Sequence, residues 1–549
     1  MKRYTVYHYT TMVNKCQRNE QKIKCFFEKS FPTFYIKVNG LRHNTTMAKI
    51  LIIGGGVAGL SAGIHARLQG HRAIVCERQS MAGGNLTGWH RGAYHIDNCI
   101  HWLTGTNPHT DTYRLWQTLG MLGDGVSLYQ AESLYTCEID GKTLSLYNDL
   151  SRLQAEMLAV SPADKKSIRR LIRAVETVQA LCRIQGEKHD KGFSLTQTAW
   201  KTPSLLYYFK RSIGDVAKTF RHKLLRAFLT CFIGEEFSSL ALLVVYATFC
   251  GNNGALPVGG SLAAAKRITE RFETLGGELL LGKTATKIHF KNGKATSVSF
   301  TDGTNIRADY IVCATDTKTT FEKLLRLPIP KRLQKQYENP AFKRFSSYHT
   351  AFACEQKKLP FRGDFIFPMS REYKDVLRAE YIVLRDFSHE QDFAPHGETV
   401  LQTLTFCDEQ TAKEFISLRN DKAAYTRKKQ EIAQALQAVI QKKFPKLNLR
   451  FIDAWTPATY ARYTGADTGS WMSFLFPKNT LPLRLPSEIP TLKNVFLATQ
   501  WQQAPGGLPT AADMGKRAIE RIVKQESSLI NKVRLALPKR TKRKRAKRA

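Results

Sequence analysis

Closely spaced cysteines are missing from this sequence. It has 11 cysteines among 549 residues, an odd number, and none of them form a CxxC pair. Disulfide scaffolds and zinc ribbons need dense or regularly spaced cysteines. No His/Cys cluster has the spacing of metal ligands either. We therefore expect a reducing compartment, place the protein in the cytoplasm, and expect no metal site.

Long apolar runs are missing too. No stretch of about 18 apolar residues occurs, the length that a membrane-spanning helix needs, so we expect no such helix. The most apolar segment, residues 240–250, is too short to span a membrane. It is typical of a core helix or strand, or alternatively of the wall of a greasy substrate tunnel or a contact with a membrane surface.

Acidic residues are scarce relative to basic ones, at 46 against 83, which gives a formal charge of +37. Much of the excess lies at the ends, since residues 539–549 hold eight Lys/Arg and residues 1–46 hold nine against two acids. Like charges repel and stay solvated, so we expect a basic extension over 1–46 and a disordered tail over 526–549. Met47 is an alternative start of the mature chain; a basic organelle presequence is another interpretation.

The basic tail has two candidate partners. It could attract anionic lipid head groups or make non-specific nucleic-acid contacts. We favour the lipid surface, hence a peripheral membrane protein, and expect no specific nucleic acid. A liposome pull-down with and without residues 532–549 tests this, and equal binding by both forms would contradict it.

The first regular elements form a β-turn-α-β unit. Residues 49–53 are a short apolar strand, and residues 57–69 have helical spacing of apolar side chains. Gly70 is expected to end that helix, and residues 73–76 follow as a second strand. The unit has the length that a parallel crossover requires.

Further along, helical and β-rich segments alternate. The spacing predicts mainly helix over 150–250 with a start at Ser161-Pro162, β structure over 279–312, a helix over 423–443, a strand over 494–499 and a helix over 510–524. Asn292-Gly293 and Asp302-Gly303 predict tight turns in the β-rich part. The fold class is therefore α/β. We expect a discontinuous dinucleotide-binding domain over 47–150, 255–325 and 490–525, and an inserted α+β substrate domain over 151–254 and 326–489.

A glycine pattern lies between the first strand and the first helix. In Gly54-x-Gly56-x-x-Gly59, the first glycine permits a tight turn, the second lets the backbone approach a pyrophosphate, and the third lets helix and strand pack closely. Val57 and Ala58 open the helix, whose free N–H groups favour phosphate. Glu77 follows the second strand, where a carboxylate can accept hydrogen bonds from both ribose hydroxyls.

A second glycine pair distinguishes the cofactor. Arg78 and Gly83-Gly84 form an RxxxxGG pattern directly after the acid. A second close backbone approach at this point suits the larger, extended FAD molecule rather than NAD. The sequence therefore predicts a Rossmann-like FAD-binding domain.

These motifs, continuing through Tyr94–Cys99, resemble the phytoene desaturase family, whose relatives include carotenoid isomerases, retinol saturases and amine-oxidase-like flavoproteins. Residues 255–261 resemble the segment that helps hold the adenosine half of FAD. Residues 494–500, 505–509 and 514–515 resemble the C-terminal flavin motif. The resemblance covers about residues 48–525 and is loose in the middle.

The resemblance implies further cofactor residues. They are Asp97, Ala285 where the adenine packs, Gln500, and the loop Gly507-Leu508-Pro509 whose N–H groups face the pyrimidine end of the flavin. The family usually has a bulkier aliphatic residue near Ala285 and an acid near Thr499-Gln500. These departures put the subfamily and substrate in doubt.

For chemistry, the resemblance implies hydride transfer between flavin and a hydrophobic, isoprenoid-like polyene, in desaturation or saturation. Non-redox isomerisation is the alternative, and a basic nucleic-acid-binding or scaffold protein is a second one. His101 and Trp102 follow Asp97 and are the candidate catalytic residues, with a structural role as the alternative for His101. Residues 456–465 resemble a segment on the substrate side. Neither the substrate, the electron acceptor nor the oligomeric state follows from the sequence.

Overall fold

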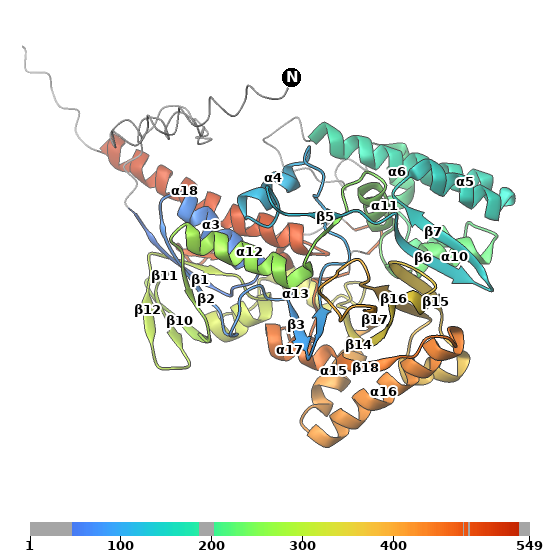
Figure 1. Cartoon of the computed structure of the whole chain (residues 1–549). Coiled ribbons are helices and arrows are strands. Elements are labelled where there is room, and N and C mark those ends of the chain that lie inside the picture. The colour runs from blue at the N-terminus through green and yellow to red at the C-terminus, as the bar shows by residue number, and fades with distance from the viewer. Residues whose placement is uncertain (1–46, 186–201, 476, 481–483, 537–549) are drawn as a thin grey trace, which may run out of the picture. The chain divides into compact units, whose positions relative to one another are not determined.

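Five short parallel strands form the sheet that carries the glycine-rich turn (Figure 1). In sheet order they are β19 (Val495–Leu497), β13 (Tyr310–Cys313), β1 (Lys49–Ile53), β2 (Arg72–Cys76) and β9 (Glu278–Leu280). Parallel strands buried on both faces are expected to be continuously apolar. This explains why β1 reads Lys-Ile-Leu-Ile-Ile, with its last four residues buried.

A different layer packs against each face of this sheet. Ile50 and Ile52 pack toward a helical layer, which consists of α3 (Val57–Leu68), α12 (Gly260–Thr274) and α18 (Leu508–Ala536). Leu51 and Ile53 belong to the opposite core, which includes residues of a three-stranded antiparallel sheet. That sheet consists of β10 (Ala285–Lys291), β11 (Lys294–Phe300) and β12 (Asn305–Arg307). The alternation of side chains along a strand thus separates the two layers.

A seven-stranded sheet forms the second layered part. Its order is β18 (Arg450–Trp455), β14 (Ser346–Glu355), β17 (Glu398–Cys407), β16 (Tyr381–Asp386), β15 (Asp364–Pro368), β6 (Ser133–Ile139) and β7 (Lys142–Tyr147). All neighbours are antiparallel except β15 and β6. The small antiparallel pairs are β3 (Gly88–Arg91) with β4 (Tyr94–Asp97), and β5 (Leu128–Tyr129) with β8 (Leu256–Pro257).

Helices cover this sheet on both faces. One set is α5 (Leu150–Val160), α6 (Lys165–Gln185), α8 (Pro203–Phe209), α9 (Ile213–Ala217), α10 (Lys223–Thr230) and α11 (Ser239–Phe249). The other includes α14 (Lys374–Leu377), α15 (Glu409–Leu418) and α16 (Lys422–Lys443). The remaining α-helices of the described residues are α4 (Asp111–Thr118), α13 (Lys331–Glu338) and α17 (Pro457–Thr464).

The structure is a computed structural model that describes residues 47–185, 202–475, 477–480 and 484–536. The basic extension lies outside this part, as do residues 537–549 of the basic tail. Within the described part, α18 runs on to Ala536, beyond the helix end expected at 524, so residues 526–536 of the expected disordered tail are helical. No helix in these ranges is long and apolar enough to cross a membrane.

Most sequence-predicted elements are confirmed. The first strand, the helix after it and the second strand lie at β1, α3 and β2. The Asn292-Gly293 turn has positive φ angles of 53° and 69°, as a tight hairpin turn between β10 and β11 requires. The domain limits stay a prediction. The seven-stranded sheet takes β6 and β7 from the segment 47–150, which we expected in the cofactor domain.

Candidate functional site

The turn between β1 and α3 brings the backbone of Gly54 into close contact with the backbone of Gly59. A Cβ atom on Gly59 would lie 1.9 Å from the carbonyl oxygen of Gly54, so only glycine permits this packing of helix on strand. Gly54 has a φ of 105°, which favours glycine. At Gly56, by contrast, a Cβ atom would meet nothing closer than 3.8 Å. The missing side chain there leaves open space in front of the helix N-terminus.

Glu77 holds this turn from the end of β2. Its Oε2 atom accepts a hydrogen bond of 2.7 Å from the Gly55 N–H, and its Oε1 atom accepts one of 2.9 Å from the Gln79 N–H. A carboxylate has about four acceptor positions. The two backbone donors therefore leave acceptor capacity for a ribose hydroxyl.

The second glycine pair interlocks with the first. The N–H of Gly83 donates to the Gly55 carbonyl at 2.8 Å, and Gly56 and Gly83 form an isolated parallel bridge. A Cβ atom on Gly84 would lie 3.1 Å from the Cα of Gly56. The two motifs thus lie backbone against backbone and open onto the same space.

Arg78 reaches a distant segment. Its Nε atom donates to the Tyr463 carbonyl at 3.1 Å, and its Nη2 atom donates to the Arg462 carbonyl, at the end of α17. Burial lowers the pKa of Arg78, and the positive charge of Arg462 lowers it further. The arginine therefore positions residues 462–463 beside the glycine turns.

The C-terminal loop opens onto the same space. The side-chain amide of Gln500 accepts from the Gly507 N–H at 2.8 Å and donates to the Trp471 carbonyl at 3.0 Å. Gly507 directly precedes α18, whose first turn has free N–H groups and a positive dipole end. Gln500 thus uses its amide to hold the loop in place.

A cavity of about 980 Å³, here called the large cavity, brings these parts together. The sequence-predicted residues that line it are Gly54, Gly56, Val57, Ala58, Glu77, Arg78, Gly83, Gly84, His101, Trp102, Ala285, Gln500, Gly507, Leu508 and Pro509. The open space at Gly56, the two helix N-termini and the free acceptor capacity of Glu77 fit a flavin nucleotide. Ala285 lies at the start of β10, where its small side chain leaves room for a ring.

Two sequence-predicted residues do not line the large cavity. Gly59 packs against Gly54, as its place in the motif predicts. The Asp97 carboxylate accepts hydrogen bonds from the Ser261 N–H at 2.5 Å, the Ser261 hydroxyl at 2.7 Å and the Cys99 N–H at 3.1 Å. In this structure Asp97 therefore ties the β4 segment to the start of α12.

The other end of the large cavity is apolar. Helix α11, the apolar segment of the sequence, buries Leu242 and Leu243 in the core and lines the cavity with Ala241, Val244 and Val245. The interpretation as a core helix is confirmed, and one side of the same helix forms a cavity wall. Trp102 lies 5.6 Å from Phe232, ring centre to ring centre, and both line this end.

His101 lies in the same wall beside charged groups. Its Nδ1 atom is 3.7 Å from the Asp364 carboxylate, and Arg385 lies 3.6 Å from that carboxylate's other oxygen. Burial lowers the pKa of His101, and the positive charge of Arg385 lowers it further. His101 is therefore neutral at pH 7.

Two more histidines near Arg385 share this behaviour. Burial lowers the pKa of His349 to about 3 and that of His389 to about 4, and Arg385 contributes to both shifts. Below pH 6.5 the unfolded chain therefore binds protons that the folded chain does not. The free energy of unfolding should fall as pH drops from 6.5 toward 4, by about 1.4 kcal/mol per pH unit for each such histidine.

Urea unfolding between pH 7.5 and 5 checks this expectation. His389→Gln should reduce the pH-dependent loss of unfolding free energy by the contribution of one histidine. His396→Gln, at an exposed position, should leave this loss unchanged. An unfolding free energy that is the same at both pH values would contradict the prediction.

Sequence reasoning missed several cavity residues. Asp316, Lys283 and Trp471 line the large cavity but belong to no recognised motif. Burial raises the pKa of Asp316, and its Oδ2 atom has no hydrogen-bond partner in the described part of the chain. Asp316 follows the end of β13, and its position after a buried parallel strand was the available signal.

Comparison with known proteins agrees with this architecture. A family model for flavin containing amine oxidoreductases matches residues 57–523. Prolycopene isomerase 1 of an Oncidium hybrid cultivar is 22% identical over 455 residues, which cover 77% of this chain and 74% of that protein. The neurosporene-forming phytoene desaturase of Rhodobacter capsulatus is 26% identical over 294 residues, which cover 51% of this chain and 55% of the relative.

Solved structures show the same fold. An oxidoreductase from Methanosarcina mazei superposes with a TM-score of 0.55 at 16% identity, over 86% of this chain and all of that chain. Cyclohexylamine oxidase from Brevibacterium oxydans gives 0.53 at 16% identity, over 88% of this chain and all of its own. The predicted α/β fold with a Rossmann-like domain is confirmed, as is the predicted family resemblance. Because the family model spans most of the chain, this protein is an oxidoreductase that belongs to the flavin containing amine oxidoreductase family.

Proposed function

We propose that the protein binds FAD in the large cavity and transfers hydride between the flavin and a hydrophobic, isoprenoid-like substrate. The observation that carries this proposal is that one cavity extends from the glycine turns, Glu77 and Ala285 to the apolar side of α11. A polar dinucleotide end and an apolar end share one space. When bound, FAD supplies a ring that accepts or returns a hydride.

The residues of the chain have distinct roles in this proposal. Gly56, Gly84 and the first turn of α3 bind the pyrophosphate, and Glu77 binds the adenosine ribose. The N-terminus of α18 stabilises negative charge on the flavin ring. Gln500 and Trp471 keep that N-terminus in position through the hydrogen bonds to Gly507 and to the Trp471 carbonyl.

The apolar end of the cavity positions the substrate. Trp102, Phe232 and the side chains of α11 exclude water and hold a greasy chain in one orientation, which favours reaction by positioning. His101 and Trp102 are our candidates for substrate contact. Because His101 is neutral, we assign it contact and orientation rather than the role of a proton donor.

The purified protein tests the proposal through its absorption spectrum. A bound flavin gives a yellow protein, and adding a polyene substrate without oxygen should bleach the flavin band in a desaturation. A colourless protein that cannot be reconstituted with FAD would overturn the proposal.

Non-redox isomerisation of a polyene is the second candidate, since prolycopene isomerases are among the relatives. Turnover with chemically reduced flavin and no net electron acceptor distinguishes isomerisation from hydride transfer. Isomerised product in this assay, without any change in the oxidation state of the substrate, would favour the second candidate.

Narrowing the apolar end should impair turnover without impairing cofactor binding. Ala241→Trp places a large ring on the cavity side of α11, at one of the small residues that line the large cavity. We expect kcat/KM for a polyene to fall about tenfold or more, which corresponds to about 1.4 kcal/mol. The flavin spectrum should be unchanged.

Ala423→Trp, the same change at an exposed position on α16, is the control and should leave kcat/KM as in the wild type. Equal kcat/KM values for Ala241→Trp and the wild type would show that the substrate does not use this end of the cavity.

A further inference from the structure

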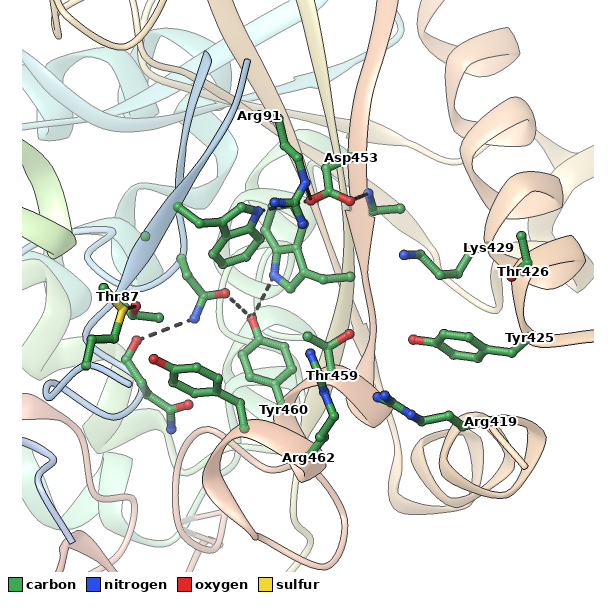
Figure 2. Close-up of a pocket in the computed structure, with 18 of the residues that line it drawn as sticks. Thr87, Arg91, Arg419, Tyr425, Thr426, Lys429, Asp453, Thr459, Tyr460 and Arg462 are labelled. Atoms are coloured by element: carbon green, nitrogen blue, oxygen red, sulfur yellow. Dashed lines mark hydrogen bonds and ion pairs between the residues drawn. The ribbon is translucent and has the colours of Figure 1, made fainter. Parts of the chain in front are cut away.

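A second cavity has a volume of about 660 Å³, and Figure 2 shows residues that line it. We call it the basic cavity. Its walls come from three regions distant in sequence, namely the β3 region, the start of α16, and β18 with α17. Asn85 and Tyr463 line both cavities. None of the residues given roles in FAD binding above lines the basic cavity, so the motifs leave it without a function.

One side of the first two turns of α16 lines the basic cavity. Lys422, Tyr425, Thr426 and Lys429 line the cavity, and their spacing of i, i+3, i+4 and i+7 puts them on one helix face. Arg419 precedes the helix and Arg462 faces it from α17. In Figure 2 the charged ends of Arg419, Lys429 and Arg462 and the hydroxyl of Tyr425 point into the same space.

Positive charge dominates the lining. Among the residues that the structure describes, Asp453 is the only acid that lines the cavity. Its carboxylate already pairs with Arg91 at 2.8 Å and accepts from the Trp89 indole at 3.0 Å. In the described part of the chain, the side chains of Arg419, Lys422 and Arg462 make no ion pair or hydrogen bond. Together with Lys429, these three side chains make four cations that face the cavity without an acid to neutralise them.

Further groups suit an anion. Tyr463 lines the cavity, and its buried hydroxyl has no hydrogen-bond partner in the described part of the chain. Burial raises the pKa of the Tyr463 hydroxyl, which therefore stays protonated and can donate a hydrogen bond. Arginine forks together with lysine ammonium groups are the donors that phosphate prefers.

We propose that the basic cavity binds the phosphate group of a small organic phosphate. The group lies among Arg419, Lys429 and Arg462, and the remaining volume holds the rest of the molecule. The same phosphate chemistry belongs to a nucleotide and to a prenyl diphosphate, and binding of each is measured separately. This site is additional to the proposed flavin site.

Calorimetric titration of the full chain with pyrophosphate, ADP and geranylgeranyl diphosphate tests the proposal. The test variant is Arg419→Gln/Lys429→Gln, which removes two lining cations on the surface. The control is Arg427→Gln/Lys446→Gln, which removes two exposed cations that do not line the cavity. Both variants have the same net charge and the same basic tail, so the non-specific attraction of the anionic ligand is equal in the two proteins.

We expect the test variant to bind pyrophosphate about tenfold or more weakly than the wild type, with less than a twofold change in the control. Tighter binding of ADP than of pyrophosphate assigns the site to a nucleotide. Tighter binding of the prenyl diphosphate assigns it to an isoprenoid. Equal loss in test and control variants, or no wild-type binding at millimolar pyrophosphate, overturns the proposal. None of these residues lines the large cavity, where the same ligands could also bind, so only binding that the test variant loses and the control keeps is assigned to the basic cavity.

Discussion

Gly56→Val is expected to abolish flavin binding while the chain stays folded. Gly56 has an ordinary backbone conformation, with φ of −71° and ψ of 178°, and a Cβ atom there meets no atom closer than 3.8 Å. The valine is therefore tolerated by the protein. Its methyl groups nonetheless fill the space in front of α3 that we assign to the pyrophosphate.

A titration with FAD, followed by flavin fluorescence, measures the effect. We expect the dissociation constant to rise about a hundredfold or more, which corresponds to about 2.7 kcal/mol. Gly56→Ala should give an intermediate loss, since one methyl group fills less of the space. Melting temperatures of the flavin-free proteins should agree. Unchanged affinity in Gly56→Val would show that the cofactor does not approach this turn.

Gly59→Ala should act on the fold itself. The added methyl group would lie 1.9 Å from the Gly54 carbonyl oxygen and 3.2 Å from the Ala314 side chain. Neither can move aside, because the strand is buried between two layers and the helix packs against α12 and α18. Overpacking of this kind costs about 3 kcal/mol or more when backbone has to shift.

Urea unfolding of the flavin-free protein measures this loss, since bound cofactor would add its own stabilisation. The control is Leu68→Ala on the same helix, where the side chain is exposed, and we expect a change below about 0.5 kcal/mol. Equal stability of Gly59→Ala and the wild type would mean that α3 and β1 are farther apart than in this structure.

The local sequence pattern was sufficient to predict helices, strands and turns that involve only neighbouring residues. The apolar run of β1, the spacing in α3 and the Asn292-Gly293 turn each determine a structure within a few residues. The glycine motifs and Glu77 were also readable, because each has a specific backbone role at a fixed distance from a strand. Their meeting in one cavity followed from the parallel order of the strands.

Contacts between distant segments could not be predicted from the local sequence pattern. Nothing near Arg78 indicates that its guanidinium binds carbonyls of residues 462 and 463. Arg419 and Lys429 have the sequence context of any solvated helix, and only the fold shows that they face Arg462 across a cavity. The same holds for β6, which pairs with β15 across more than two hundred residues.

The order of strands in the five-stranded sheet also bears on how the protein is made. Strand β19 completes the sheet beside β13, and α18 packs on α3. A growing chain that has not yet reached residue 495 leaves the hydrogen-bonding edge of β13 and one side of α3 exposed. The cradle that we propose for the cofactor closes only when this last segment has been released from the ribosome, so we expect flavin insertion to follow translation.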